Sequence, residues 1–197
     1  MASERQIRVG NVAIGGGAPV VVQSMTLTKT HDVEATTAQI AALASAGCEI
    51  VRVAVPKGED ADALAKIVRL SPLPVIADIH FNASLALRAI EAGVAAVRIN
   101  PGNIGGPDKV AEVVRAAKQA GMPMRIGANS GSLPRHLAEL AQADQAEALV
   151  EAALEEVRLL ESLGFYDFKI SVKSSHVPTM IRAYRLLASK VPYPLHL

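Results

Sequence analysis

The chain has 197 residues, of which 50% are apolar and 20% are charged, so it is long enough for one domain with a sizeable core. The net charge of +1, without basic runs interleaved with aromatic residues, gives no indication of a nucleic-acid partner. The single cysteine, Cys48, excludes an internal disulfide and a multi-cysteine metal site, and no apolar run approaches the roughly 20 residues of a membrane-spanning helix.

The first element, at residues 7–20, reads IRVGNVAIGGGAPV and predicts a β-hairpin with the three consecutive glycines as its turn. We expect this hairpin to close the floor of a barrel. Apolar strands follow at intervals of one strand-plus-helix unit. They are predicted at about 20–25, 50–55, 74–79, 95–100, 122–127, 167–172 and 193–197. The longest interval, 134–163, predicts a longer or doubled helical excursion.

Four segments repeat one pattern, in which an Ala-rich amphipathic helix ends at a glycine and an apolar strand with an internal cation follows. The glycines stand where a helix end favours a left-handed residue: Gly47, Gly93, Gly121 and Gly164. Strands that alternate with helices predict a parallel sheet covered by helices. Seven such units, without a glycine-rich dinucleotide turn after the first strand, favour a TIM-type (β/α)8 barrel over a doubly wound sheet.

A complete barrel of this type usually takes about 250 residues. We therefore expect residues 1–197 to form a single barrel domain that stops after its seventh strand. A seventh strand left as an open edge would favour poor solubility.

Polar residues interrupt these strands at every second position near their C-terminal ends, although buried parallel strands are usually continuously apolar. Because side chains alternate across a strand, the polar set is predicted to point inward and to converge on the C-terminal mouth, where barrel active sites lie. The set comprises Arg52, Asp78, His80, Arg98, Asn100, Arg125, Asn129, Lys173 and His196, together with Ser171. Lys169 lies early in its strand, so we expect a structural role for it.

Four of these residues are cations, Arg52, Arg98, Arg125 and Lys173, and they face one carboxylate, Asp78. Unpaired buried charges cost several kcal/mol each, and whole domains are stable by only about 5–15 kcal/mol. We therefore expect the cations to lie at a solvent-filled mouth and to be neutralised by a ligand. The planar fork of arginine suits phosphate oxygens, so the pattern indicates a diphosphate or a bisphosphate.

The remaining candidates are weaker. His31, His136 and His176 lack metal-ligand spacing and are predicted to be surface or loop residues, and Cys48 is expected to pack in the core. The loop at 101–107 fits a phosphate-binding helix N-terminus and a tight turn equally well. No nucleophile–base pair is present in the pattern, so we assign no catalytic residue and no metal ligand. Lys29 is left unassigned.

Six motifs together resemble 4-hydroxy-3-methylbut-2-enyl diphosphate synthase, the iron–sulfur enzyme of the methylerythritol phosphate route to isoprenoids. They are VVVQSMT with DVEATTAQI, ADIHFN, RINPGNIG, RIGANSGSL, KISVKSS and PLHL. The resemblance spans the chain and implies reductive ring opening of 2-C-methyl-D-erythritol 2,4-cyclodiphosphate to the hydroxymethylbutenyl diphosphate. It also implies ferredoxin or flavodoxin as the electron donor and a homodimer in the full-length protein. The polar N-terminal residues, the lack of an apolar run that could span a membrane and the single cysteine predict a cytoplasmic domain.

The resemblance further implies roles for the inward residues. Arg52, Arg98, Arg125 and Lys173 would clamp the diphosphate. Asp78, Asn100 and Asn129 would orient the carbon skeleton of the substrate. His80 and His196 would support the site or lie at its mouth.

The family also carries a C-terminal domain that supplies three cysteines and a glutamate to a [4Fe-4S] cluster. This chain has no ligand set for such a cluster, because Cys48 stands alone. We therefore expect the substrate-binding half of a two-part oxidoreductase, without turnover on its own. The alternative is a stand-alone barrel that binds a phosphorylated ligand without redox chemistry. A third, weaker alternative is a pterin-synthase-like or aldolase-like barrel, with Lys173 as the Schiff-base lysine.

Overall fold

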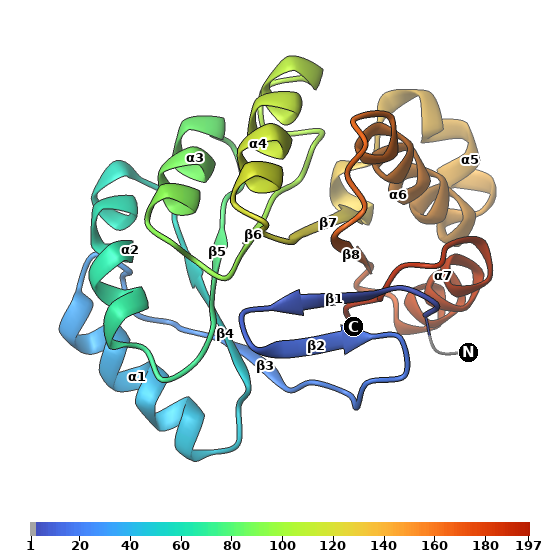
Figure 1. Cartoon of the computed structure of the whole chain (residues 1–197). Coiled ribbons are helices and arrows are strands. Elements are labelled where there is room, and N and C mark those ends of the chain that lie inside the picture. Colours follow the sequence, from blue (N-terminus) through green and yellow to red (C-terminus); the bar gives the residue numbers. More distant parts are fainter. Residues whose placement is uncertain (1–2) are drawn as a thin grey trace.

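The computed structural model describes residues 3–197, and its first feature is an antiparallel hairpin of β1 (Gln6–Val9) and β2 (Val12–Gly15). Figure 1 shows this hairpin lying between the β3–β4 side of the molecule and α7. Val9 pairs with Val12, so the turn is formed by Gly10 and Asn11. The predicted hairpin is confirmed, but the prediction that the three glycines form its turn is wrong. Gly10, with a φ of 58°, provides the left-handed conformation that a two-residue turn requires.

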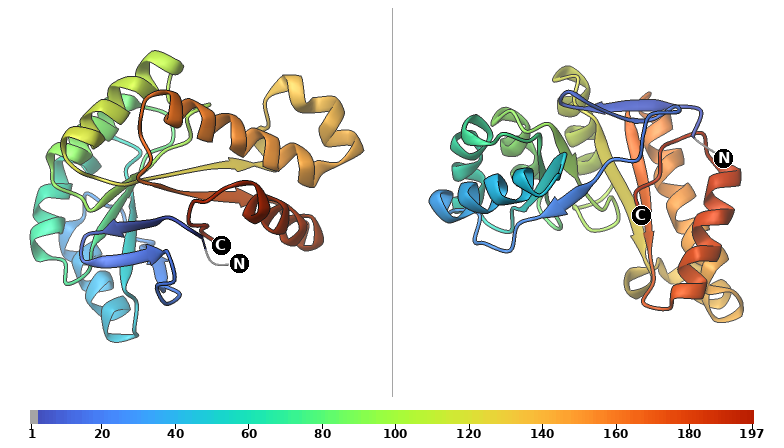
Figure 2. Two further views of the ribbon diagram at one scale, coloured as in Figure 1. Left: turned by 45° about the vertical axis from the view of Figure 1, so that its right-hand side comes forward. Right: turned by 90° about the horizontal axis from the view of Figure 1, so that it is seen from below.

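Residues 23–173 contribute a six-stranded parallel sheet in sequential order. Its strands are β3 (Gln23–Met25), β4 (Ile50–Ala54), β5 (Val75–Asp78), β6 (Ala96–Arg98), β7 (Met124–Asn129) and β8 (Phe168–Lys173). The sheet curls into an open barrel, as the views in Figure 2 show. Strands joined in this order by helices are the arrangement of a TIM-type barrel, so the predicted fold class is confirmed.

Helices cover the outer face of the curled sheet (Figure 1). They are α1 (Val33–Ser45), α2 (Gly58–Leu70), α3 (Ala83–Glu91), α4 (Pro107–Gln119), α5 (Ala138–Ala143), α6 (Gln145–Ser162) and α7 (Val177–Lys190). Short 3-10 turns at Ser130–Ser132 and Arg135–Leu137 precede α5, and with α5 and α6 they form the predicted doubled helical excursion. The four helix-ending glycines all have positive φ angles, of 90°, 79°, 60° and 64°. No helix in residues 3–197 is long and apolar enough to cross a membrane.

The predicted seventh strand at 193–197 is reduced to a single parallel bridge between Ile170 and Leu195. The prediction of a full strand is therefore wrong. Pro192 and Pro194 contribute to this outcome, because proline has no N–H to donate to a β-ladder.

Two hydrophobic clusters pack against the sheet, one on its helix-covered outer face and one at the floor of the barrel interior. The larger one lies between the sheet and the helices and includes Val51, Val53, Val97 and Ile126, which have the opposite phase to the polar set. The smaller one combines Ile7 and Val9 of the hairpin with inward residues at the N-terminal ends of three strands, namely Ile50, Ile76 and Ala96. The hairpin thus closes the barrel floor, as the sequence predicts, and polar interior residues begin directly above this plug.

Candidate functional site

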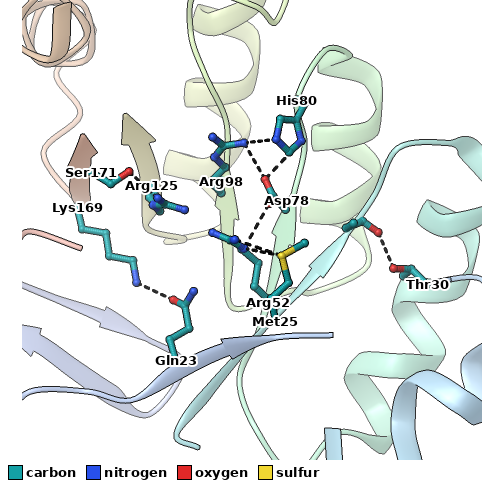
Figure 3. Close-up of polar contacts among 11 residues, drawn as sticks. Gln23, Met25, Thr30, Arg52, Asp78, His80, Arg98, Arg125, Lys169 and Ser171 are labelled. Carbon is teal, nitrogen blue, oxygen red and sulfur yellow. Dashed lines mark hydrogen bonds and ion pairs between the residues drawn. The ribbon is translucent and has the colours of Figure 1, made fainter. Parts of the chain in front are cut away.

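Strand register places Asp78, Arg98 and Arg125 in one row above the floor cluster, with Arg52 one inward position lower, beside the floor residue Ile76. Arg52 of β4 pairs with Ile76 of β5 and with Met25 of β3. Asp78 of β5 pairs with Arg98 of β6, and Arg98 pairs with Arg125 of β7. Because neighbouring strands are held about 4.8 Å apart, this register brings three guanidinium groups around one carboxylate. Figure 3 shows these side chains converging from four adjacent strands.

Asp78 is the centre of this cluster, and its side chain is only 4% exposed. Its Oδ1 accepts a hydrogen bond from Arg98 Nη1 at 3.0 Å, and its Oδ2 lies 3.3 Å from Arg52 Nε. The carboxylate therefore pairs with arginines from both flanking strands. Such charge-assisted contacts compensate the cost of burying the three groups.

His80 joins the cluster from the loop after β5. Its Nε2 accepts a hydrogen bond from Arg98 Nη1 at 2.6 Å, which leaves the proton of the neutral ring on Nδ1, 3.7 Å from Asp78 Oδ1. Burial, partly offset by the charge of Asp78, lowers the pKa of His80. The imidazole side chain is 48% exposed, so His80 lies where the sequence places it, at the edge of the mouth.

Arg125 differs from the other two arginines because it lacks an acidic partner among residues 3–197. Its Nη2 donates to Ser171 Oγ at 2.5 Å, while its Nε and Nη1 are buried without a hydrogen-bond partner in that part of the chain. The residue is 1% exposed. Burial, and then the charges of Arg52 and Arg98, lower the pKa of Arg125 to about 10. Two unsatisfied donors on one buried cation are the strongest sign of a missing anionic partner.

These exposures correct one prediction. Arg98 and Arg125 are 4% and 1% exposed, so they do not lie at a solvent-filled mouth. The physical reason is that the single carboxylate of Asp78 contacts Arg52 and Arg98 together, which compensates two of the guanidinium groups and allows the cluster to sit just above the floor. The side chain of Arg52 is 15% exposed, and Lys173, at the C-terminal end of β8, faces solvent.

Two contacts from β3 belong to the same cluster but were missed by sequence reasoning. Arg52 Nε and Nη2 donate to Met25 Sδ at 3.3 and 3.2 Å. Gln23 Oε1 accepts from Lys169 Nζ at 3.2 Å across the barrel, and burial followed by the charge of Arg125 lowers the pKa of Lys169 to about 8. The alternation that identified the other inward residues also applies to Gln23 and Met25, and it could have found them.

The other predicted site residues lie around this core. Asn100 is buried, and its Oδ1 accepts the Gly102 N–H at 3.0 Å, so it shapes the loop after β6. Asn129 pairs in register with Lys173 at the ends of β7 and β8. Burial, and then the charges of Arg125 and Lys169, lower the pKa of His196 well below its ordinary value, which keeps its imidazole neutral. Burial, and then the charges of Arg125, Arg98 and Arg52, also lower the pKa of Lys173.

A cavity of about 420 Å³ opens beside the cluster, in the gap between β3 and the segment that follows α7. Its polar lining includes Gln23, Lys169 and His196, and its apolar walls include Ile14, Val21 and Leu195. The cavity therefore reaches the basic interior on the side where the sheet is open.

The remaining histidines lie outside this site, as the sequence predicts. His136 contacts Glu155 at 2.6 Å, and His176 contacts Thr179 at 2.8 Å, both at exposed positions. His31, Glu59 and Asp60 offer ligand atoms within 4.8 Å of one another.

Asp60, one of the two acidic members of the His31 group, already accepts hydrogen bonds from the backbone. The donors are the N–H groups of His31 and Lys57, at the positive N-terminal end of α2, which disfavours a cation. Cys48 is buried and its thiol donates to the Ile50 carbonyl. The chain thus offers no set of thiolates for an iron–sulfur cluster.

Curled parallel strands with outer helices, and a basic row above a plugged floor, define an α/β barrel whose interior suits an anionic ligand. The family model described as "GcpE TIM-barrel domain" matches residues 4–197. The chain belongs to this family.

Curated relatives share this similarity over about half of their own length. A protein of Geobacter sulfurreducens is 56% identical over 196 residues, which cover 100% of this chain and 56% of that protein. A protein of a Parafrankia strain is 59% identical over 194 residues, covering 98% of this chain and 50% of the relative. Both are named 4-hydroxy-3-methylbut-2-en-1-yl diphosphate synthase (flavodoxin). The chain therefore spans about half the length of the relatives that it matches.

Solved structures with low sequence identity share the fold alone. The 3-dehydroquinate dehydratase of Geobacillus kaustophilus superposes with a TM-score of 0.70 at 15% identity, over 98% of this chain and 78% of its own. The 7,8-dihydropteroate synthase of Vibrio fischeri superposes with a TM-score of 0.64 at 14% identity, over 97% of this chain and 76% of its own.

Proposed function

We propose that this chain is the substrate-binding barrel of a 4-hydroxy-3-methylbut-2-enyl diphosphate synthase. In this proposal its basic interior binds the diphosphate of 2-C-methyl-D-erythritol 2,4-cyclodiphosphate. The observation that carries the proposal is Arg125, a buried cation with two donors unsatisfied among residues 3–197. In addition to burial, Arg52 and Arg98 add charge that lowers the pKa of Arg125, and the charge of Arg125 in turn lowers the pKa of Lys173.

The proposed chemistry explains why a surplus of positive charge is useful. Opening the cyclic diphosphate breaks a carbon–oxygen bond, and the released phosphate oxygen keeps the bonding electron pair and gains negative charge. The carbon skeleton takes up two electrons from the external donor and loses one hydroxyl group as water. Fixed arginines next to the released phosphate oxygen stabilise the opened form more than the closed form, and this difference lowers the barrier. Asn100 and Asn129 then orient the carbon skeleton, and neutral His80 and His196 can donate hydrogen bonds without adding charge.

These residues cannot carry out the electron-transfer part of the reaction. The family's [4Fe-4S] cluster would supply the electrons, and this chain lacks the ligand set for it. We infer flavodoxin as the electron donor, because the curated relatives carry that word in their names. A homodimer in the full-length protein and a cytoplasmic location complete the proposal, and the latter is supported by the lack of cysteine pairs.

Exposed apolar side chains at the mouth are compatible with a covering domain. Leu27, after β3, is 90% exposed, Phe81, after β5, is 74% exposed, and Val177, after β8, is 57% exposed. Such a rim supports the arrangement in which the cluster-bearing part of a second subunit lies over the barrel.

Calorimetric titration with inorganic pyrophosphate tests the binding step. Arg98→Ala is expected to weaken binding by more than about 1.5 kcal/mol, roughly tenfold, because it removes a charge-assisted contact. The matched control is Arg158→Ala, whose guanidinium pairs with Glu151 on the surface of α6 and should leave the affinity unchanged. Unchanged affinity in Arg98→Ala would remove Arg98 from the site.

A second measurement separates the synthase from a stand-alone phospho-ligand-binding barrel, because both would bind pyrophosphate. The protein purified anaerobically from its natural source should have a mass near that of the full-length relatives and about four irons. A mass of 20.6 kDa without iron would favour the stand-alone barrel instead.

A further inference from the structure

Tyr184, on α7, interrupts the β-ladder that attaches the last residues of the chain to β8. The attachment begins as a regular parallel rung. The Ile170 N–H donates to the Pro194 carbonyl at 3.0 Å, and the His196 N–H donates to the Ile170 carbonyl at 2.8 Å. In a parallel ladder the next hydrogen bond would run from the Val172 N–H to the His196 carbonyl.

Both of those backbone groups bind the Tyr184 hydroxyl instead. The Val172 N–H donates to Tyr184 Oη at 3.2 Å, and the Tyr184 hydroxyl donates to the His196 carbonyl oxygen. One phenol oxygen therefore stands between the two strands in place of the direct hydrogen bond. The ring packs against the main core, so the hydroxyl is held from the helix side.

This insertion fixes the direction of His196. Leu195 pairs with Ile170, whose side chain belongs to the outer core, so the following residue points to the barrel interior. His196 lines the cavity together with Lys169 and Gln23. The hydroxyl of Tyr184 sets the orientation of the His196 peptide, and with it the direction of the Cα–Cβ bond.

We infer that Tyr184 is a positioning residue, which orients the neutral His196 imidazole toward the basic interior by holding its backbone carbonyl. The inference rests on the proposed function in one respect only, namely the identity of the ligand that the His196 imidazole contacts. A neutral imidazole beside four cations can donate a hydrogen bond to an anion. Because the imidazole is uncharged, it adds no further buried positive charge when the ligand is absent.

Tyr184→Phe tests the inference, because it removes the hydroxyl and keeps the ring. The expected results are faster exchange of the Val172 amide proton and shifted ring-nitrogen resonances of His196 in NMR spectra. Pyrophosphate affinity should fall about 3- to 10-fold, as for loss of one neutral hydrogen bond. The matched control is Tyr166→Phe, whose exposed ring lies near Arg5 and should change none of these readouts.

A double-mutant cycle separates positioning from general loss of structure. His196→Gln should weaken pyrophosphate binding in the wild-type background and weaken it much less in the Tyr184→Phe background, because the second variant has already released the imidazole. Equal losses in both backgrounds would overturn the positioning role.

Two further readouts keep the outcome clear. In the unmodified protein, the Tyr184 hydroxyl proton should give a slowly exchanging resonance close to the Val172 amide proton, and its absence would count against the inference. Unchanged His196 resonances in Tyr184→Phe would overturn it. If those resonances shift although the unmodified chain has no affinity for pyrophosphate, Tyr184 still positions His196, and the proposed ligand is wrong.

Discussion

Asp78 is shared by two arginines that come from the strands on either side of its own, and this sharing explains how so many charges can be buried. Arg52 and Arg98 each lie within 3.3 Å of one carboxylate oxygen. Arg125 lies next to Arg98 in register but has only the Ser171 hydroxyl. The three arginines therefore differ in what their removal would cost, although they look alike in the sequence.

Substituting methionine for Arg125 and for Arg98 exposes this difference. Arg125→Met is expected to raise the free energy of unfolding by about 1–3 kcal/mol, because an unpaired buried cation is replaced by an apolar chain. Arg98→Met should lower it by about 3 kcal/mol, because it leaves Asp78 with one partner fewer. Urea unfolding of phosphate-free protein measures both. Equal losses of stability in the two variants would mean that Arg125 is compensated by a partner.

At this scale the sequence predicted which residues point inward, because strand alternation decides that. It could not predict that Asp78 bridges Arg52 and Arg98, since this depends on the register between three strands. Met25 and Gln23 were missed, although strand alternation places both on the same inward face as Arg52.

Helix α6 lies over β7 and buries a carboxyl group that the proposed site does not use. Glu156 has an Oε2 that is buried without a hydrogen-bond partner among residues 3–197. Burial raises the pKa of Glu156 to about 8, and the Gly127 N–H and the charge of Arg98 only partly oppose this rise. The contact between α6 and β7 therefore includes the protonated carboxyl group of Glu156.

This contact predicts a pH-dependent stability. Between about pH 4.5 and pH 8 the folded protein binds the Glu156 proton and the unfolded chain does not, so stability from this group falls as pH rises. Glu156→Gln should remove a slope of up to about 1.4 kcal/mol per pH unit across that window. Glu151→Gln, which loses only a surface pair with Arg158, is the control and should keep the slope. Parallel pH profiles for Glu156→Gln and the unmodified chain would contradict the prediction.

Elements were predictable where local signals and tertiary packing agree. The helix-ending glycines and the apolar runs placed β4 through β8, because both signals depend on neighbouring residues. The hairpin turn was misplaced because any of several glycines could adopt a positive φ, and pairing of Val9 with Val12 decides between them. The segment at 193–197 was read as a strand from its apolar residues, whereas Pro194 and the inserted Tyr184 hydroxyl limit it to one bridge.

Across the whole molecule, the Lys169–Gln23 hydrogen bond joins the first and last strands of the open sheet through the barrel interior (Figure 3). The two strands are not paired with each other in residues 3–197, so this contact spans the gap that a ladder would otherwise close. Its donor is a lysine whose pKa is lowered to about 8 by burial. The Lys169 amine in this contact is therefore charged below about pH 8 and neutral above it.

Lys169→Met tests the energetic effect of that charge. Between about pH 8 and pH 10.5 the unfolded chain binds the lysine proton and the folded protein does not, so stability from this group rises with pH. The methionine variant should be more stable than the unmodified chain at pH 7, and its advantage should shrink by up to about 1.4 kcal/mol per pH unit toward pH 10.5. Lys109→Met, an exposed lysine paired with Glu112, is the control. An advantage that stays constant with pH would show that the folded and unfolded chains bind the Lys169 proton alike, so that burial does not lower its pKa.

The floor hairpin has a consequence for the order in which the chain can fold. Its residues precede the parallel strands in the chain, yet Ile7 and Val9 pack on Ile50, Ile76 and Ala96, and the Arg5 N–H donates to the Pro192 carbonyl at 2.9 Å. The hairpin can pair locally at once, but its docking site exists only after three strands are in register and α7 has brought Pro192 back. Contacts between such distant residues form slowly because the intervening loop must close first. Docking of the plug is thus a late event, which completes the barrel from beneath.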